Sequence, residues 1–423
     1  MNAAHIDGDN ADVVIIGSGH AGVQVAISLR EEGYAGGIVV VGDELAEPYN
    51  RPSLSKEHLA ATDSSEPQPL TPKGQLASLG VRVLLGVAVE SLDLDGHSVT
   101  LSSGEQLAWG ELVLATGASH RVLPLDGAEL SNAFYLRTLA HADALRAALA
   151  DAKRVVVVGA GFIALEFAAV ARARDLEVTV IAPDRALARA VSAPLSEYVE
   201  RVHRELGSEL LLDRGVEGFE HDGTRVTAVV DSTGVRHEAD LVVIGIGAIP
   251  RTDLAQNAGL EVSDGILVGP DLRTSHPHVW AVGDCARMRI AGAHGEEGTS
   301  VRLESVQNAV GQAQHAAAII AGSERGDYAD VPWFWSHQGP LRLQMAGLAY
   351  QADEFVIPGD VDSGKFSVFC FRQGELVAVE SVNKPADHMA ARVALRDRGG
   401  DIHPDTVREP GFTLKGWLAE HPA

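Results

Sequence analysis

Two glycine-rich loops occur in this chain, each placed between an apolar run and a stretch with helical spacing. The loop GSGHAG at residues 17–22 follows the run DVVIIG, and the loop GAGFIA at residues 159–164 follows RVVVVG. Another apolar run comes after each helical stretch, GIVVVGDE in the first case and EVTVIA in the second. Continuous β-branched strands that alternate with helices are typical of a parallel sheet. The chain is therefore predicted to be an α/β protein with two Rossmann-like units.

The first loop has the residue types that a dinucleotide site needs. Glycines allow a tight turn and let the backbone approach a pyrophosphate, and the helix N-terminus supplies free N–H groups. An acid at the end of the next strand can accept hydrogen bonds from ribose hydroxyls. The alternative is a glycine-rich turn in an unrelated α/β protein. The residues predicted to contact this first nucleotide are Gly17, Gly19, His20, Ala21, Gly22 and Asp43.

The second loop departs from the first at its strand end. The strand stops at Ala182, so it lacks the acid that selects NADH over NADPH. Asp184 is a candidate for binding the ribose, whereas Arg185 either pairs with a 2′-phosphate or is an ordinary surface arginine. NADH is the expected donor, with NADPH left open. The residues predicted for this second nucleotide are Gly159, Gly161, Phe162, Ile163, Asp184, Arg185 and Gly247.

The rest of the chain extends this organisation. Alternating strand patterns follow each unit, a helical pattern covers residues 306–321, and Pro332 opens a region of short strands. We expect one nucleotide-binding domain at 1–113 and 248–330, a second at 114–247, and a C-terminal α+β domain at 331–423.

Charge and cysteine content exclude several classes of function. A net charge of -24 disfavours nonspecific binding to nucleic acid or anionic membranes. Cys285 and Cys370 are the only cysteines and form no CxxC motif, so neither dithiol chemistry nor a metal site is expected. The start of the chain lacks a cationic signal region, and Glu166 with two glycines interrupts the most apolar run. A cytoplasmic protein is expected.

Five motifs together resemble one family of flavoproteins. They are RPSLSK at 51–56, ATG at 115–117, GAGFIALE at 159–166, AVGDCA at 281–286 and PWFWSHQ at 332–338. This set resembles the ferredoxin reductases of the putidaredoxin reductase type, which have the glutathione-reductase-like fold. The resemblance implies FAD in the first site, NAD(P)H in the second, and a [2Fe-2S] ferredoxin as electron acceptor. That ferredoxin would serve a P450 or a ring-hydroxylating dioxygenase, as in aromatic hydrocarbon catabolism. The chain departs from the family pattern at Phe162, Ala164, Ala182 and Gln307.

The resemblance also implies roles for residues outside the glycine loops. Lys56 would lie near the flavin N5 edge with Glu166 as its partner, and Trp335 would lie at the ferredoxin-facing edge. Glu166 sits inside the apolar stretch FIALEFAAV, which argues against a solvated glutamate. For Trp335 the alternative is ordinary core packing. The further residues that the resemblance assigns to FAD are Arg51, Lys56, Val89, Thr116, Gly117, Arg137, Asp284 and Val306.

Docking of an acidic ferredoxin on this acidic protein would need a local basic patch. The candidates by sequence proximity are Arg287, Arg289, Arg302 and Lys384. Two competing functions stay open, an NAD(P)H oxidase and a flavoprotein like apoptosis-inducing factor. We expect a monomer or a weak homodimer.

Overall fold

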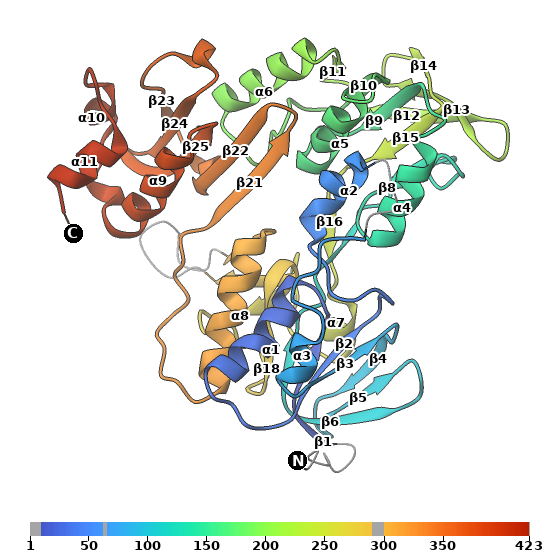
Figure 1. Cartoon of the computed structure of the whole chain (residues 1–423), viewed down its shortest axis with the longest axis vertical. Coiled ribbons are helices and arrows are strands. Elements are labelled where there is room, and N and C mark those ends of the chain that lie inside the picture. Colours follow the sequence, from blue (N-terminus) through green and yellow to red (C-terminus); the bar gives the residue numbers. More distant parts are fainter. Residues whose placement is uncertain (1–9, 62–65, 290–299, 423) are drawn as a thin grey trace. The chain divides into compact units, whose positions relative to one another are not determined.

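The computed structural model describes residues 10–61, 66–289 and 300–422. The chain forms two compact units (Figure 1). The first consists of Met1–Arg51, Pro67–Ser119 and Ala248–Asp330, and the second of Pro52–Glu66, His120–Gly247 and Val331–Ala423. The described residues 52–61 and 66 thus belong to the second unit. The outermost ends of the expected domains, residues 1–9 and 423, lie outside the described residues, and the division into three functional domains stays a prediction.

The first unit is built on a mixed sheet with the order β3-β2-β1-β6-β5-β4, and β18 pairs with β6. The pairs β1–β2, β2–β3, β1–β6 and β6–β18 are parallel, whereas β4–β5 and β5–β6 are antiparallel. The strands are β1 (Asn10–Ile16), β2 (Ile38–Gly42), β3 (Val81–Leu85), β4 (Val89–Asp93), β5 (Ser98–Leu101), β6 (Gln106–Leu114) and β18 (Val279–Ala281). A smaller sheet contains β17 (Ile266–Val268), β19 (Ala286–Arg289) and β20 (Ser300–Val301).

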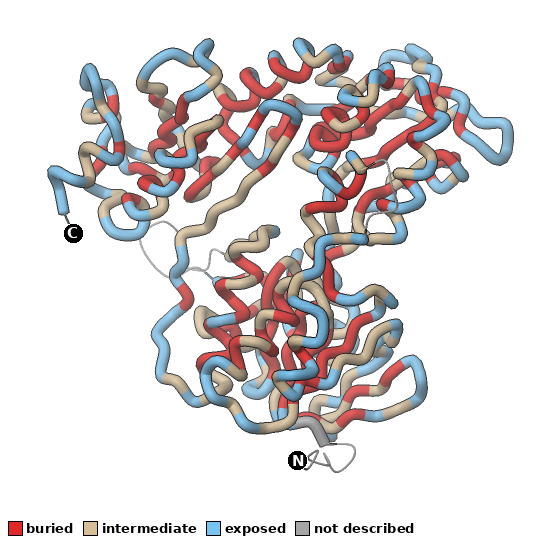
Figure 2. The backbone as a smooth tube through the Cα atoms, viewed as in Figure 1, coloured by how far each residue is buried: buried red, intermediate tan, exposed pale blue. Residues whose placement is uncertain are grey.

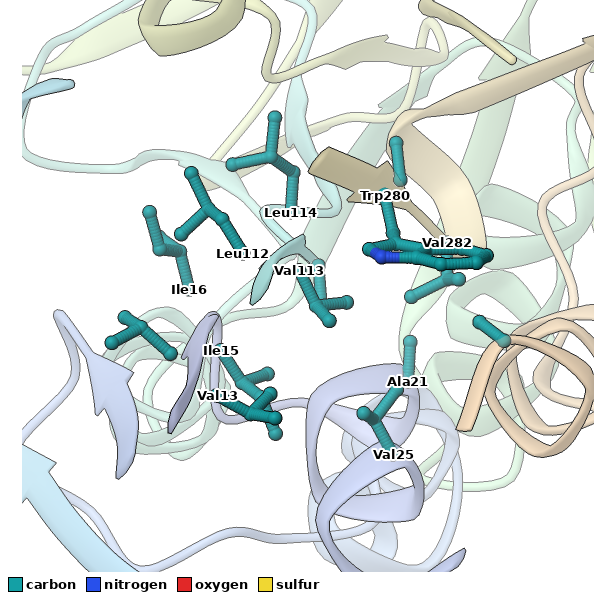
Figure 3. Close-up of a cluster of buried hydrophobic side chains, with 14 of the residues drawn as sticks. Val13, Ile15, Ile16, Ala21, Val25, Leu112, Val113, Leu114, Trp280 and Val282 are labelled. Atoms are coloured by element: carbon teal, nitrogen blue, oxygen red, sulfur yellow. The ribbon is translucent and has the colours of Figure 1, made fainter. Parts of the chain in front are cut away.

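The core of the first unit lies between this sheet and two helices. Helix α1 (His20–Glu31) follows β1 directly, and α8 (Val306–Ile320) packs along α1. Figure 3 shows Val13 and Ile15 of β1, Ala21 and Val25 of α1, and Trp280 of β18 in this core. Because successive β-branched residues of β1 and β2 are all buried, both faces of the sheet are covered, as the continuous apolar runs predict.

The second unit contains a parallel sheet with the order β11-β10-β9-β15-β8. Its strands are β8 (Ala133–Tyr135), β9 (Arg154–Val158), β10 (Glu177–Ile181), β11 (Glu209–Leu211) and β15 (Leu241–Ile244). An antiparallel sheet of β12 (Val216–His221), β13 (Val226–Asp231) and β14 (Arg236–Glu238) follows. Short strands β7 (Ala118–His120) and β16 (Ala248–Pro250) lie where the chain passes between units.

The C-terminal part of the second unit is an antiparallel sheet with the order β21-β22-β25-β24-β23. These strands are β21 (Trp333–Gln338), β22 (Leu341–Gly347), β23 (Glu354–Val356), β24 (Phe366–Arg372) and β25 (Glu375–Val382). Helix α9 (Pro385–Asp397) packs on β22 and β25. In Figure 2 the buried residues follow the strands and one side of the helices. The expected α/β architecture with a C-terminal α+β region is confirmed.

The remaining helices are short or connect strands. They are α2 (Glu57–Ala60), α3 (Gln75–Ser78), α4 (Leu139–Ala148), α5 (Phe162–Arg172), α6 (Ala193–Glu205), α7 (Asp253–Asn257), α10 (Pro404–Arg408) and α11 (Leu414–Glu420). Within the described ranges, no helix combines the length and the apolar character that crossing a bilayer requires.

Candidate functional site

The first glycine loop brings a strand and a helix closer together than any other residue type would allow. Gly17 has φ +117, and a Cβ placed there would lie 2.1 Å from the carbonyl oxygen of Ala115. A Cβ on Gly22 would lie 1.8 Å from the carbonyl oxygen of Gly17. At Gly19, in contrast, a Cβ would meet no described atom within 4 Å. The loop is therefore packed on its protein side and open at the start of α1, where a phosphate can approach the backbone.

The helices that follow the two glycine loops begin without a side-chain cap. In the described part of the chain, α1 begins after Gly19 and α5 after Gly161 with no capping side chain and no acidic residue in the first turn. Helices α4, α6 and α8 are instead capped by Thr138, Ser192 and Ser305, and α9, which also lacks a side-chain cap, has Asp387 in its first turn. The first N–H groups of a helix lack partners within the helix. The two loop helices thus keep donors and positive partial charge for an anionic ligand.

Asp43, the predicted ribose ligand, follows β2 and accepts a hydrogen bond from Arg251 Nη1 at 2.8 Å. Thr116 Oγ1 in turn donates to the carbonyl oxygen of Arg251 at 2.7 Å. Both Asp43 and Arg251 are about half exposed, at 50% and 44% of the side chain. Arg251 was not predicted, because it lies 208 residues from Asp43 in sequence. The structure adds it to the candidate site in the first unit.

Arg51, His20 and Asp284 are electrostatic neighbours within the first unit. Arg51 Nη2 lies 2.7 Å from Glu44 Oε1, and the Tyr49 hydroxyl donates to the other oxygen of that carboxylate at 2.6 Å. Burial alone would lower the pKa of Arg51, but Tyr49 and Glu44 raise it above its ordinary value. Burial lowers the pKa of His20. A neutral imidazole and a guanidinium therefore stand close to the open glycine loop.

The other residues assigned to FAD are divided between the two units. In the first unit, Val89 begins β4 and Val306 begins α8, as the helical pattern predicted, although α8 ends at Ile320 and not at 321. Gly117 has φ +67, and its carbonyl oxygen accepts from the N–H of Arg251. Arg137 belongs to the second unit and precedes Thr138, the cap of α4.

The second glycine loop also brings a strand and a helix close together, although alanine replaces its third glycine. Gly159 has φ +105, and a Cβ there would lie 2.4 Å from the carbonyl oxygen of Gly245. Ala164 stands where the fingerprint often has a third glycine, and a Cβ on Gly245 would lie 3.0 Å from the Ala164 methyl group. Gly245 therefore provides the space that Ala164 takes up. Gly161 faces open space, with its nearest neighbour 4.0 Å from a Cβ. Gly247 also has φ +112.

Arg185 is partly exposed and binds the backbone of its own loop. Its guanidinium donates to the carbonyl oxygens of Ala188, Val191 and Ser192 at 2.9–3.3 Å. A guanidinium held in this way is poorly placed for a 2′-phosphate. Asp184 is exposed beside it. Ala182 is buried at the end of the strand.

The predicted pair of Lys56 and Glu166 is present. Lys56 Nζ lies 2.8 Å from Glu166 Oε2, with 13% of the lysine side chain and 3% of the glutamate side chain exposed. Two hydroxyls also donate to this carboxylate, Ser55 Oγ to Oε2 at 2.5 Å and Ser336 Oγ to Oε1 at 2.6 Å. All four residues belong to the second unit. Neither serine was predicted, since nothing in the sequence indicates that β21 meets α5.

Trp335 does not share a face of β21 with Ser336. Successive side chains of a strand point to opposite faces, so Trp335 lies with Trp333 and His337 on the other side. The rings of Trp333 and Trp335 have centroids 5.6 Å apart. Both tryptophans are partly exposed, and the place of Trp335 at a ferredoxin-facing edge stays a prediction.

The four basic residues suggested for docking are all engaged in ion pairs. Arg302, only 11% exposed, contacts Asp264 and Glu304, and Arg287 shares Asp264. Arg289 pairs with Glu261 and Lys384 with Asp387. Because each positive charge has a carboxylate beside it, these residues present little net positive charge and give no support to the expected basic patch.

Both cysteines are buried and free. Burial raises the pKa of the Cys285 thiol and that of Cys370. Cys285 Sγ donates to the carbonyl oxygens of Leu114 and Val282 at 3.4 Å. A buried, protonated thiol is a poor nucleophile, so thiol redox chemistry is not supported.

Comparison with known proteins gives consistent results along the whole chain. A family described as pyridine nucleotide-disulphide oxidoreductase matches residues 11–313, and a reductase C-terminal family matches residues 333–418. The chain is 44% identical over 410 residues to rhodocoxin reductase of Rhodococcus erythropolis, which covers 97% of this chain and 95% of that protein.

Two solved structures are similar over nearly the full length. The ferredoxin reductase for the CYP199A2 system of Rhodopseudomonas palustris has a TM-score of 0.91 and 40% identity, covering 97% of this chain and 100% of that one. The covalent putidaredoxin reductase–putidaredoxin complex has a TM-score of 0.91 and 38% identity, covering 98% and 99%.

Proposed function

The chain belongs to the pyridine nucleotide-disulphide oxidoreductase family, and on that premise we propose that it is an FAD-containing, NADH-dependent ferredoxin reductase. Its acceptor in this proposal is a [2Fe-2S] ferredoxin that supplies a P450 or a ring-hydroxylating dioxygenase. The observation that carries the proposal is the pair of glycine loops, each of which opens a helix without a side-chain cap.

The residues of the first unit fit FAD. The open face at Gly19 and the uncapped start of α1 suit a pyrophosphate, and Asp43 with Arg251 suits the ribose of its adenosine half. When bound, FAD supplies the chemistry that converts one hydride transfer into two single-electron transfers. The protein's part is to bind the cofactor, orient it and set its electrostatic surroundings.

Lys56 is proposed to supply positive charge to the flavin ring, as the family resemblance implies. The Glu166 carboxylate holds the ammonium in one position, and its two serine donors hold the carboxylate. A fixed charge of this kind stabilises developing negative charge without reorganising at the moment of reaction. No general base is needed for hydride transfer.

NADH is the proposed donor because the chain offers little to a 2′-phosphate at the second site. Arg185 is occupied by three carbonyl oxygens. The carboxylate of exposed Asp184 would accept hydrogen bonds from ribose hydroxyls and repel a 2′-phosphate. Arg189, which is exposed in the same loop, is the residue that would overturn this preference if it bound the phosphate.

The ferredoxin partner is supported by the relatives, one of which was crystallised as a covalent complex with putidaredoxin. The test is an anaerobic titration of the FAD-loaded protein with NADH and NADPH separately, followed by a [2Fe-2S] ferredoxin. We expect rapid bleaching of the flavin by NADH, slower bleaching by NADPH, and reduction of the ferredoxin. Failure to reduce any ferredoxin, together with NADH-dependent consumption of dioxygen once air is admitted, would instead identify an oxidase.

A further inference from the structure

A run of buried polar side chains continues from the Lys56–Glu166 pair into helix α6. Ser336 Oγ lies 2.6 Å from Glu166 Oε1, Gln338 Nε2 lies 3.1 Å from Ser336 Oγ, and His203 Nε2 lies 2.9 Å from Gln338 Oε1. Ser336, Gln338 and His203 are fully buried. Polar groups in such a place are costly unless each has a partner, so a run of three calls for a function.

The Glu166 carboxylate at one end of the run fixes the direction of every hydrogen bond in it. A carboxylate only accepts, so Ser336 must give its single hydroxyl proton to Glu166. Gln338 must then donate its amide N–H to Ser336 and turn its carbonyl oxygen to His203. His203 must therefore carry its proton on Nε2. All three donors point toward Glu166, and hydrogen bonds aligned in this way polarise one another and strengthen the contact with the anion.

The alternation of side chains along β21 separates its buried polar residues from its aromatic ones. Ser336 and Gln338 alternate with Trp335 and His337 along β21, so the polar pair faces α5 and α6 while Trp335 and His337 face the other way. His203 projects from α6, and burial lowers its pKa, which keeps the imidazole neutral in agreement with its role as a single donor. Its Nδ1 has no hydrogen-bond partner among the described residues.

We propose that Ser336, Gln338 and His203 form a buried relay that orients the Glu166 carboxylate and thereby positions the Lys56 ammonium for flavin reduction. The relay rests on the proposed function of Lys56. Its members are positioning residues, because they act through Glu166. Without the relay, the carboxylate keeps Ser55 and Lys56 on Oε2 but loses the hydrogen bond that holds Oε1, so it can rotate and take the ammonium with it.

The test compares Ser336→Ala with Ser367→Ala in the FAD-loaded protein. Ser367 is a matched control, since it is also fully buried in the C-terminal sheet and bonds a carboxylate, that of Asp387. Ser336→Ala should slow flavin reduction by NADH about tenfold, as expected for loss of one hydrogen bond to a charged group. It should also lower the midpoint potential of bound FAD. Ser367→Ala should leave both values unchanged.

Two further variants keep the proposal open to refutation if Ser336→Ala folds poorly. Gln338→Met should shift the rate and the potential in the same direction as Ser336→Ala, by a smaller factor. In a Lys56→Met background, Ser336→Ala should have no further effect on the rate, because the relay acts only through that lysine. The same loss in both backgrounds would place the effect in the fold and overturn the relay.

The outcomes separate the relay from the proposed function. Slow reduction in Lys56→Met with wild-type rates in both Ser336→Ala and Gln338→Met overturns the relay alone. A wild-type rate in Lys56→Met removes the proposed role of the lysine, and the relay falls with it.

Discussion

Replacing Glu166 with glutamine should show how much the buried ion pair with Lys56 contributes to the free energy of unfolding. Glu166→Gln keeps the shape of the side chain and an amide oxygen that can still accept from a serine hydroxyl, but it leaves the Lys56 ammonium, 13% exposed, without an anion. Breaking a buried pair costs about 3–5 kcal/mol. The carbonyl oxygen of Pro52, 3.1 Å from Lys56 Nζ, still accepts from the ammonium. We therefore expect a loss of about 2–3 kcal/mol, below the range for a fully buried charge.

The assay is urea unfolding of the variant beside wild type, with exposed Glu217→Gln as the control for loss of one negative charge. The double variant Lys56→Met/Glu166→Gln removes the uncompensated ammonium and should recover most of the loss, with a coupling free energy of about 2 kcal/mol. Recovery of stability should not restore flavin reduction. An unfolding free energy for Glu166→Gln within about 0.5 kcal/mol of wild type, the scatter of ordinary surface substitutions, would refute the reasoning.

Three further predictions concern other parts of the molecule. Asp43→Ala should weaken FAD binding about tenfold by removing a charged acceptor, measured as FAD retained after gel filtration, whereas Arg251→Met should weaken it less. Arg185→Met should raise the KM for NADH severalfold, with unchanged FAD content, because the loop that it closes loses three hydrogen bonds. Burial raises the pKa of Glu380 from 4.5 to about 7, so the protonated carboxyl group stabilises the folded state at low pH. This stabilisation is lost as the pH rises through 7. Glu380→Gln should not show this loss. Between pH 5 and pH 8 its free energy of unfolding in urea should rise by up to about 3 kcal/mol relative to that of wild type.

The local features of the site could be predicted because they depend on short stretches of sequence. Each glycine loop lies directly between its strand and its helix, so Gly17 and Gly159 could be placed from neighbouring residues alone. Glu166 could be identified as buried because the helix around it is apolar. Its pairing with Lys56 came from a family resemblance, since the two residues are 110 positions apart.

The residues that hold the site together were missed for one physical reason. Ser55, Ser336 and Arg251 are polar residues of ordinary type, and their roles come from tertiary contacts over more than a hundred positions. The prediction of the docking arginines failed for a different reason, since the acids that they meet, Asp264 and Glu304, lie much nearer to them in sequence. Proximity in sequence to a flavin motif gave no information about the acids that Arg302 and Arg287 would meet.

The distribution of thiols and charges explains why electrons should leave this protein through a partner. An internal acceptor would need an accessible thiolate, and the two cysteines of the chain are both fully buried with raised pKa values. The segment after the first strand–helix–strand unit contributes Ser55 and Lys56, a hydroxyl and an ammonium tied to Glu166. Neither group can accept electrons. A site of this composition can stabilise charge on a bound cofactor but cannot store it on the protein, so each reduction has to be completed by an acceptor from outside the chain.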